Sequence, residues 1–335
     1  MLPNEPAVSN LYETAKINEA KGRLGTRNLK AHVDALAELP LIAEPGTAWH
    51  YCEGVSVAAR VIETLSGQSY GDFLRDHIFE PLGMIDTFYS VPPEKRHRLA
   101  TLYEQQAALS EKLQPEYKPT TDYGGDYLKE PTLQAGGAGL VSTASDYLRF
   151  AQMLLNGGEL DGKRLLNDAS VECIMKNQLG PKFGPSPLET LAPKYQDLGF
   201  GLCGYVVSDG ASVGRPGTSG QYGWSGWANT HFWIDPNLKL VGLVMTQLIP
   251  RPEIDFNLAE TMRKAAYDAL VNEQIQVQYP NPSTKRTLFN SLRGRKVLGF
   301  SDSRQQAARL APKITAYSSL DTLRPLCLVG FQALT

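Results

Sequence analysis

The sequence predicts an α+β fold in which helices come first and an antiparallel sheet follows. Apolar residues recur at helical spacing up to residue 155. From residue 200 the spacing changes to the two-residue period of strands, and a last helical segment covers residues 254–271. Helices and strands that occupy separate stretches of a chain are typical of α+β proteins rather than of parallel α/β sheets.

Four segments before residue 156 carry the helical pattern. They cover residues 29–39, 56–65, 70–79 and 144–155. Pro40 and Gly67 follow the first two segments and end them. Thr143 precedes the last segment, and Asp146 three residues later completes an approximate capping box. The second segment places four apolar side chains on one stripe, namely Val57, Val61, Ile62 and Leu65.

Residues 92–131 interrupt this pattern with polar sequence rich in Tyr and Pro, which predicts a long surface excursion that shapes a pocket. Residues 200–207 then predict one strand. Residues 227–234 and 239–248 flank the segment Asp235-Pro236-Asn237-Leu238, a connection typical of an antiparallel hairpin.

The composition indicates a globular protein of about two domains. Its 335 residues are 42% hydrophobic and include 15 Tyr and 4 Trp, which excludes disordered and low-complexity classes. The formal net charge of −2 argues against a nucleic-acid partner. The four cysteines form no C-x-x-C pair, so we expect no disulfide framework, no metal and no cofactor.

The N-terminal segment has none of the features of a secretory signal. No basic stretch followed by an apolar one stands near Met1, and no run approaches the roughly 18 apolar residues that a membrane helix needs. We therefore expect a cytoplasmic protein without a membrane partner.

The charge is divided unevenly between two parts of the chain. Residues 281–335 carry nine basic and two acidic side chains, a net charge of +7, whereas residues 1–280 carry −9. Pro280-Asn281-Pro282-Ser283 has the composition of a linker. We predict one domain over residues 1–280 and a basic C-terminal tail with a strand-helix fragment over residues 281–335.

Four motif segments lie in the first part. They are residues 44–51, which end in Tyr51, residues 79–87, residues 136–146 and residues 224–226. In this order they resemble the serine β-lactamase-like superfamily, the group of class C β-lactamases, penicillin-binding-protein-like hydrolases and β-lactamase-fold carboxylesterases. The resemblance implies a β-lactamase/transpeptidase-like fold, with an antiparallel sheet flanked by helices. Residues 1–280 are then a partial β-lactamase-related domain.

The resemblance also implies a mechanism for ester or amide substrates. In this family a serine followed three residues later by lysine is acylated, while the lysine and a tyrosine move the protons. Tyr51 matches that tyrosine, which implies the role of general base or acid. A phenol with a pKa near 10 serves at neutral pH only when cations stabilise the phenolate. Glu53 stands where class C enzymes have asparagine and is an expected substrate contact.

Trp224, Ser225 and Gly226 stand in place of the family's Lys-Thr-Gly box and are the other expected substrate-binding residues. Esterase-like members tolerate Trp at the first position. Loss of the lysine removes a charge that binds carboxylates, which favours esters over penicillin-type substrates. By the same resemblance, the backbone N–H of Trp227 is an oxyanion donor.

The sequence departs from the family at the nucleophile. No serine has lysine at the third position after it, and Ser212 has Arg215 there. We therefore expect the sequence to begin inside the domain, without the N-terminal strands and the nucleophile helix, and to be inactive or impaired. The alternative is a non-catalytic binding or scaffold remnant, or a fragment of a fusion gene. Missing strands leave an unpaired sheet edge, which predicts self-association.

Three other motifs have simpler interpretations. Ser69 lies in a G-x-S-x-G match, but a nucleophile elbow needs a strand before the serine, and a helix is predicted there. The glycines 136, 137 and 139 predict a turn before a capped helix, because no Lys-Ser/Thr follows them as in a phosphate loop. Cys52 has no His-Asp partner pattern and is expected to be a small packing residue.

Residues 295–312 predict a strand, a Ser-Asp-Ser-Arg turn and a helix. Residues 295–335 resemble a fragment of the second RecA-like domain of superfamily 2 helicases. The sequence has no G-x-x-x-x-G-K-[ST] loop, so we expect no helicase activity. The tail is then either a solvated basic appendage or a segment joined by fusion, frameshift or assembly error, with at most weak, salt-sensitive binding of nucleic acid.

Overall fold

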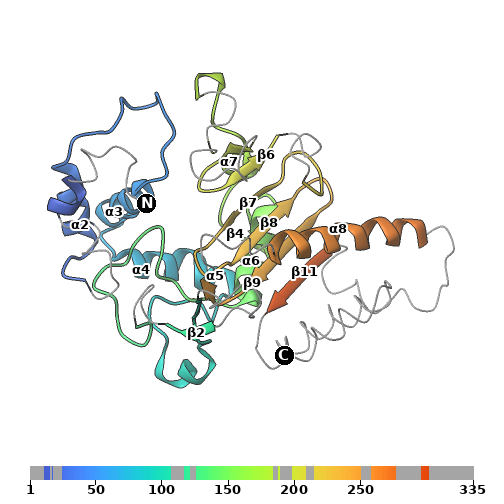
Figure 1. Ribbon diagram of the computed structural model, residues 1–335, viewed down its shortest axis with the longest axis horizontal. Coiled ribbons are helices and arrows are strands. Elements are labelled where there is room, and N and C mark those ends of the chain that lie inside the picture. The colour runs from blue at the N-terminus through green and yellow to red at the C-terminus, as the bar shows by residue number, and fades with distance from the viewer. Residues whose placement is uncertain are drawn as a thin grey trace.

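A six-stranded sheet forms the centre of the molecule, with helices on both of its faces (Figure 1). The computed structural model describes residues 11–15, 17, 25–106, 117–120, 126–183, 188, 198–208, 215–249, 258–276 and 296–301. The strand order is β11-β9-β8-β7-β6-β5. These strands are β5 (Leu198–Phe200), β6 (Tyr205–Val207), β7 (Tyr222–Ser225), β8 (His231–Asp235), β9 (Leu240–Met245) and β11 (Lys296–Ser301). Neighbours from β5 to β9 are antiparallel, which confirms the predicted α+β class.

Each of the five predicted helical segments contains a helix in the described residues. The helices are α2 (Leu29–Ala37), α3 (Gly54–Ser66), α4 (Tyr70–Leu74), the π-helix η2 (Arg75–Phe79), α5 (Glu80–Leu82), the 3₁₀ helix η3 (Pro93–Arg98), α6 (Ala144–Leu155), α7 (Asp168–Met175), the 3₁₀ helix η4 (Pro181–Phe183) and α8 (Leu258–Gln276). Of these, η3, α7 and η4 are helices that the sequence pattern does not predict. Thr143 caps α6, and its hydroxyl accepts a hydrogen bond from the N–H of Asp146 (3.2 Å). Among the described residues no helix is long and apolar enough to span a bilayer.

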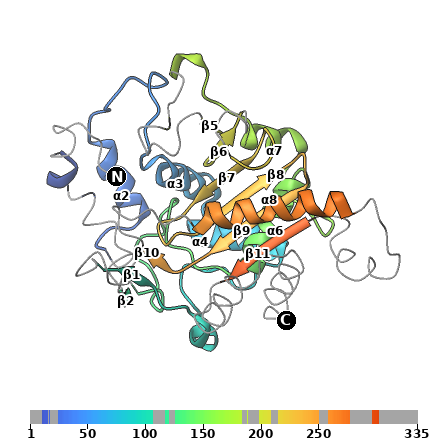
Figure 2. The same cartoon turned by 45° about the vertical axis from the view of Figure 1, so that its right-hand side comes forward.

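Each face of the sheet packs against its own helix. Along β8 the side chains alternate, so that Phe232 and Ile234 join the core that contains Leu154 of α6. Trp233 points to the other face and joins the core that contains Ala266 of α8. Figure 2 shows α8 lying along the sheet beside β9 and β11. The turn at residues 236–239 joins β8 to β9, as the sequence predicts.

The prediction of a single strand over residues 200–207 is wrong. The chain reverses within it, so that β5 and β6 form an antiparallel pair with Phe200 opposite Tyr205. Cys203 in the turn has a φ of 63°, in the left-handed region. The hydroxyl of Tyr222 holds the turn by donating to the carbonyl of Leu202 (2.6 Å). Apolar alternation continues through this tight turn, and the sequence pattern therefore conceals it.

The predicted excursion at residues 92–131 is partly regular. It contains η3 and the short strands β1 (Tyr103–Gln105) and β2 (Tyr117–Pro119). β1 pairs with β2 and also, in parallel, with β10 (Leu248–Ile249). A further small hairpin is made by β3 (Glu159–Leu160) and β4 (Lys163–Arg164). The excursion is thus attached to the end of the β8–β9 hairpin.

The apolar stripe of α3 does not face the interior. The buried residues of this helix are Ser56 and Ala59. Val57, Val61 and Leu65 are exposed, and Leu65 is 82% exposed. The helical period is therefore correct, whereas the stripe that it defines lies on the surface.

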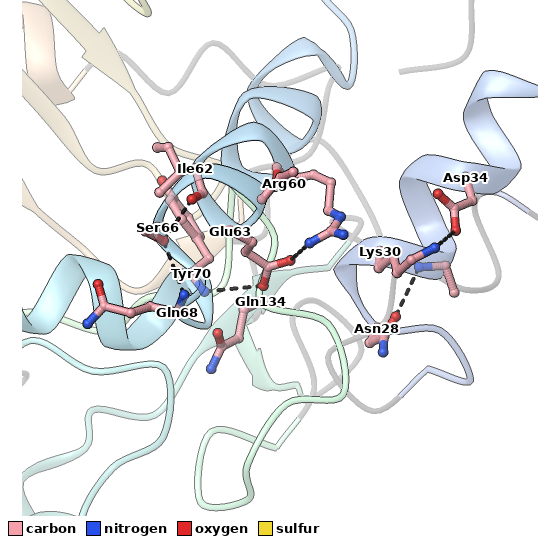
Figure 3. A network of polar contacts seen from close by, with 12 residues as sticks. Asn28, Lys30, Asp34, Arg60, Ile62, Glu63, Ser66, Gln68, Tyr70 and Gln134 are labelled. Carbon is pink, nitrogen blue, oxygen red and sulfur yellow. Dashed lines mark hydrogen bonds and ion pairs between the residues drawn. The ribbon is translucent and has the colours of Figure 1, made fainter.

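Polar contacts join α3 to α4. Glu63 accepts hydrogen bonds from the side chain of Arg60 (3.1 Å) and from the N–H of Tyr70 (3.2 Å), as Figure 3 shows. Ser69 caps α4, because its hydroxyl oxygen accepts from the N–H of Asp72 (3.1 Å). The G-x-S-x-G match is therefore a helix-to-helix turn, as predicted, and Ser69 has a capping role.

The strand β11 adds the C-terminal part of the sequence to the sheet. It lies parallel to β9, with Lys296 opposite Leu240 and Ser301 opposite Met245. The strand predicted at the start of residues 295–312 is thus present, and the helix predicted after it lies outside the described residues. Among the described strands, β5 and β11 lie at the edges of the sheet. Self-association through an edge and the domain boundary at residue 280 stay predictions.

Candidate active site

Tyr51 lies at the end of a turn that leads into α3. Within the turn, the N–H and the hydroxyl of Thr47 both donate to the carbonyl of Glu44, at 3.1 Å and 2.6 Å. The chain then enters α3 at Gly54. The side chain of Tyr51 is 47% exposed, so that part of its ring is open to a ligand.

Five aromatic side chains, Tyr51 among them, form a cluster in which Trp224 contacts three of the other rings. This aromatic cluster consists of Trp49, Tyr51, Phe200, Tyr205 and Trp224. The rings of Tyr51 and Trp224 stack with centroids 5.9 Å apart. Phe200 contacts Trp224 edge-on at 5.5 Å and Trp49 at 5.2 Å. Such pairs each contribute about 0.5–1.5 kcal/mol beyond their burial, and they hold the first and fourth motif segments together.

The strand β7 positions the residues that replace the Lys-Thr-Gly box. Trp224 and Ser225 pair with β8. The N–H of Gly226 donates to a backbone carbonyl across the following turn (2.8 Å). Trp227 lies in that turn, and its side chain is 64% exposed. The structure thus places Trp224 against Tyr51, while the oxyanion role of the Trp227 N–H stays a prediction.

Glu53 has contacts within the helices beside the site. Its carboxylate accepts a hydrogen bond from the hydroxyl of Ser56 (3.1 Å) and lies 3.5 Å from Nε2 of the fully buried His32. Burial, together with the nearby Cys52 and Glu53, raises the pKa of Tyr12. These contacts connect α2 to the start of α3, and the substrate contact expected of Glu53 stays a prediction.

The glycine-rich segment at residues 136–139 packs on the first turn of α3. A Cβ at Gly136 would overlap the backbone carbonyl of Val55, and a Cβ at Gly137 would lie 2.8 Å from a methyl group of Val55. Only glycine permits this close approach of the two backbones. The third motif segment therefore lies beside the N-terminal end of α3, close in sequence to Tyr51. The prediction of this segment as a simple turn does not reveal this contact.

A polar network joins the second motif segment to the third. The carboxylate of Asp146 accepts hydrogen bonds from the N–H of Asp86 (2.7 Å) and the hydroxyl of Thr87 (2.8 Å). The side chain of Asp86 accepts from Lys95 (2.8 Å) and Arg98 (2.7 Å). Burial raises the pKa of Asp146, whereas the hydrogen bond from Arg98 and then that from Lys95 lower the pKa of Asp86. This network fixes the framework around the site.

Three members of the cluster are residues that the motifs do not identify as site residues, namely Trp49, Phe200 and Tyr205. Phe200 and Tyr205 meet because they pair across β5 and β6. Their only signal in the sequence is the aromatic character of a short strand-like segment.

Cys52 is exposed, so the prediction that it is a packing residue is wrong. In the described part of the chain no three His, Cys, Asp or Glu side chains gather as a metal site requires.

Comparison with known families settles the relationship that the four motif segments indicate. The beta-lactamase family model matches residues 7–267. The chain belongs to this family. The four motif segments and the whole aromatic cluster lie within the match, and the predicted superfamily and fold are confirmed. The helicase-like resemblance of residues 295–335 lies outside the match and stays a prediction.

The relatives of this beta-lactamase family chain include esterases. The chain is 30% identical over 226 residues to protein Rv1367c of Mycobacterium tuberculosis, which is 66% of this chain and 54% of that protein. It is 29% identical over 256 residues to lovastatin esterase of Penicillium rubens, which is 70% of this chain and 60% of that protein. The chain thus spans little more than half the length of these relatives.

A solved structure shows the same fold. EstCE1, described as a hydrolase with promiscuous acyltransferase activity, matches with a TM-score of 0.63 and 22% identity. The match covers 79% of this chain and 68% of EstCE1. At this identity the likeness concerns the fold alone.

Proposed function

We propose that the chain carries the tyrosine and tryptophan side of an esterase-type site of the beta-lactamase family. The stack of Tyr51 on Trp224 carries the proposal, because it joins the family's tyrosine position to the first position of its Lys-Thr-Gly box. In the complete reaction Tyr51 is the general base or acid, and the N–H of Trp227 donates to the oxyanion.

The aromatic cluster supports a small, uncharged ester or amide as the ligand. An apolar group placed on Tyr51 and Trp224 gains roughly 25 cal/mol for each Å² of apolar surface removed from water. Trp224 supplies no positive charge to a carboxylate, which favours simple esters over penicillin-type substrates. The name of the relative lovastatin esterase also supports ester chemistry.

An acyl-enzyme mechanism needs a nucleophile, and the 335 residues contain no Ser-x-x-Lys sequence. Without one, only binding, proton transfer by Tyr51 and the oxyanion donor contribute, and turnover falls to a small residual rate. The same observation favours a second candidate function, a non-catalytic module that binds these esters on the aromatic cluster without cleaving them.

Hydrolysis of p-nitrophenyl butyrate and nitrocefin by the full chain tests the proposal. We expect a low rate above the spontaneous one for the butyrate ester, a lower rate for nitrocefin, and a return to the spontaneous rate in Tyr51→Phe. Ser69→Asn is the matched control, because it removes the hydroxyl but keeps a capping side chain.

The outcomes separate the candidates. Robust turnover that is insensitive to Tyr51→Phe contradicts the esterase assignment, and loss of turnover in Ser69→Asn makes Ser69 the nucleophile. Binding of the ester without hydrolysis above the spontaneous rate supports the non-catalytic module.

A further inference from the structure

A buried arginine of α8 lies next to the aromatic cluster. Arg263 is 2% exposed. One terminal nitrogen of its guanidinium donates to the hydroxyl of Tyr205 (2.8 Å), and the other donates to the side-chain carbonyl of Gln221 (3.0 Å). The guanidinium also lies over the ring of Trp233, 4.4 Å from its centroid. Arg263 thus binds one member of the cluster directly.

Two guanidinium groups hold Tyr205 from different sides. Arg263 binds its hydroxyl, and Arg215 lies over its ring at 4.9 Å. Glu260 connects the two arginines, since its carboxylate lies 3.3 Å from Arg215 and 3.5 Å from Nε of Arg263. Burial of a guanidinium has a desolvation cost that only paired, hydrogen-bonded geometry offsets. The arrangement therefore fixes one orientation of the Tyr205 ring.

Tyr205 transmits this orientation across β7. It pairs with Gly223, where a Cβ would lie 2.8 Å from the Tyr205 hydroxyl. The absence of a side chain at Gly223 lets the phenol lie against β7. The next residue of the strand is Trp224, whose ring centroid is 6.4 Å from that of Tyr205. The ring of Trp224 also stacks on the ring of Tyr51.

We infer that Arg263 is a positioning residue for Trp224 and acts through the hydroxyl and the ring of Tyr205. This inference rests on the proposed function only for the assignment of the aromatic cluster as the ester site. The contacts of Arg263 with Tyr205 and of Tyr205 with Trp224 exist with or without catalysis. The guanidinium of Arg263, on the face of the sheet that α8 covers, thus determines the orientation of the Trp224 ring that a ligand contacts.

The test uses the full chain labelled with 5-fluorotryptophan. The four tryptophans give four ¹⁹F resonances, which single Trp→Phe variants assign. We expect Tyr205→Phe and Arg263→Met to move the Trp224 resonance by more than its linewidth. Arg263→Lys keeps the charge but loses the two-pronged donor, and we expect it to give a smaller shift. Where the Arg263 variants fail to fold, Tyr205→Phe alone carries the test, since it removes only a hydroxyl.

Tyr267→Phe is the matched control. It is the same type of change on α8, where the Tyr267 hydroxyl donates to Asp235 (3.0 Å). A merely structural role of the α8 contacts predicts equal effects of Tyr205→Phe and Tyr267→Phe on the Trp224 resonance. An unchanged Trp224 resonance in Tyr205→Phe, or an equal shift in Tyr267→Phe, overturns the inference.

Ligand binding separates this inference from the proposed function. Phenyl butyrate is titrated against the same resonances, and we expect its Kd to rise several-fold in Tyr205→Phe. Absence of phenyl butyrate binding to the unsubstituted chain contradicts the proposed function. In that case the shift of Trp224 in the unliganded variants still decides whether Arg263 positions it.

Discussion

Tyr51 and Trp224 stack on each other, with ring centroids 5.9 Å apart and an angle of 26° between the ring planes. Tyr51 precedes α3, and Trp224 belongs to a central strand of the sheet, so the stack joins the helical part to the sheet. The motif order in the sequence is consistent with such a meeting, but only the fold brings the two rings together.

Trp224→Ala removes the ring that contacts most of the aromatic cluster. We expect a loss of roughly 3 kcal/mol in the free energy of unfolding, because large aromatic-to-alanine changes leave a cavity. Trp227→Ala is the control, since its side chain is mostly exposed, and we expect a change within about 0.5 kcal/mol. Urea unfolding followed by far-UV circular dichroism measures both values. Equal losses in the two variants contradict the placement of Trp224 in the cluster.

Gly136→Ala tests the contact between the glycine-rich segment and α3. The added Cβ overlaps the carbonyl of Val55, so the two backbones must separate. We expect a destabilisation of about 2 kcal/mol, as is usual for overpacking. The space around Gly180 is open, and Gly180→Ala is expected to change stability by less than about 1 kcal/mol. Thermal unfolding of the two variants compares them, and an equally stable Gly136→Ala variant is the contrary result.

Asp86 makes the stability of the protein sensitive to acid. Its pKa is lowered from the ordinary value of 3.8, mainly by the hydrogen bond from Arg98. A lowered folded-state pKa contributes stability above the unfolded pKa, and this contribution is lost as the pH falls through the folded value. We therefore expect the unfolding free energy to fall as the pH drops below about 3.8. Asp146 has a raised pKa and acts with the opposite sign at higher pH. The pKa of Asp72 is also lowered, mainly by its hydrogen bond with Ser69, so a variant of Asp86 is needed to separate the two carboxylates.

Asp86→Asn tests this expectation. The variant is expected to lose about 2 kcal/mol at neutral pH, since it weakens charged hydrogen bonds, and to show a flatter profile below pH 3.8. Asp161→Asn disrupts the more exposed pair with Arg149 and is expected to cost less than about 1 kcal/mol. Unfolding in urea at pH values from about 2.5 to 7 gives both profiles. A profile of Asp86→Asn that parallels the unsubstituted chain contradicts the role of Asp86.

Leu65→Gln tests the orientation of α3. Because Leu65 is exposed, we expect a stability change within about 0.5 kcal/mol. Leu154→Ala, in the core beneath the sheet, is expected to cost about 3 kcal/mol. Denaturant midpoints of the two variants make the comparison. A large loss in Leu65→Gln means that the apolar stripe of α3 is covered in solution.

The sequence pattern predicts those elements that depend on local signals. α6 is such a case, because the cap at Thr143 and the apolar stripe agree with each other. The reversal between β5 and β6 is not predictable in this way, since an apolar tight turn looks like a continuous strand. The exposure of Val61 is not predictable from the sequence pattern either, because periodicity defines an apolar stripe but not whether another element packs against it.

The same distinction between local signals and long-range contacts applies to the residues of the candidate site. Tyr51 and Trp224 are predictable because they stand in recognisable motif segments, and the match over residues 7–267 confirms the family. Phe200, Tyr205 and Arg263 belong to no motif. Their roles depend on pairing between strands and on the packing of α8 against the sheet, which are long-range relationships.

We propose that the surface formed by Tyr51 and Trp224 binds uncharged apolar esters. Titration of the 5-fluorotryptophan-labelled chain with phenyl butyrate measures this most directly, because each of the four tryptophans reports separately. We predict a saturable shift of the Trp224 resonance that is lost in Tyr51→Ala, while the resonance of the buried Trp233 stays in place. No shift of Trp224 up to the solubility limit of the ester, or an equal saturable shift in Tyr51→Ala, would contradict the account.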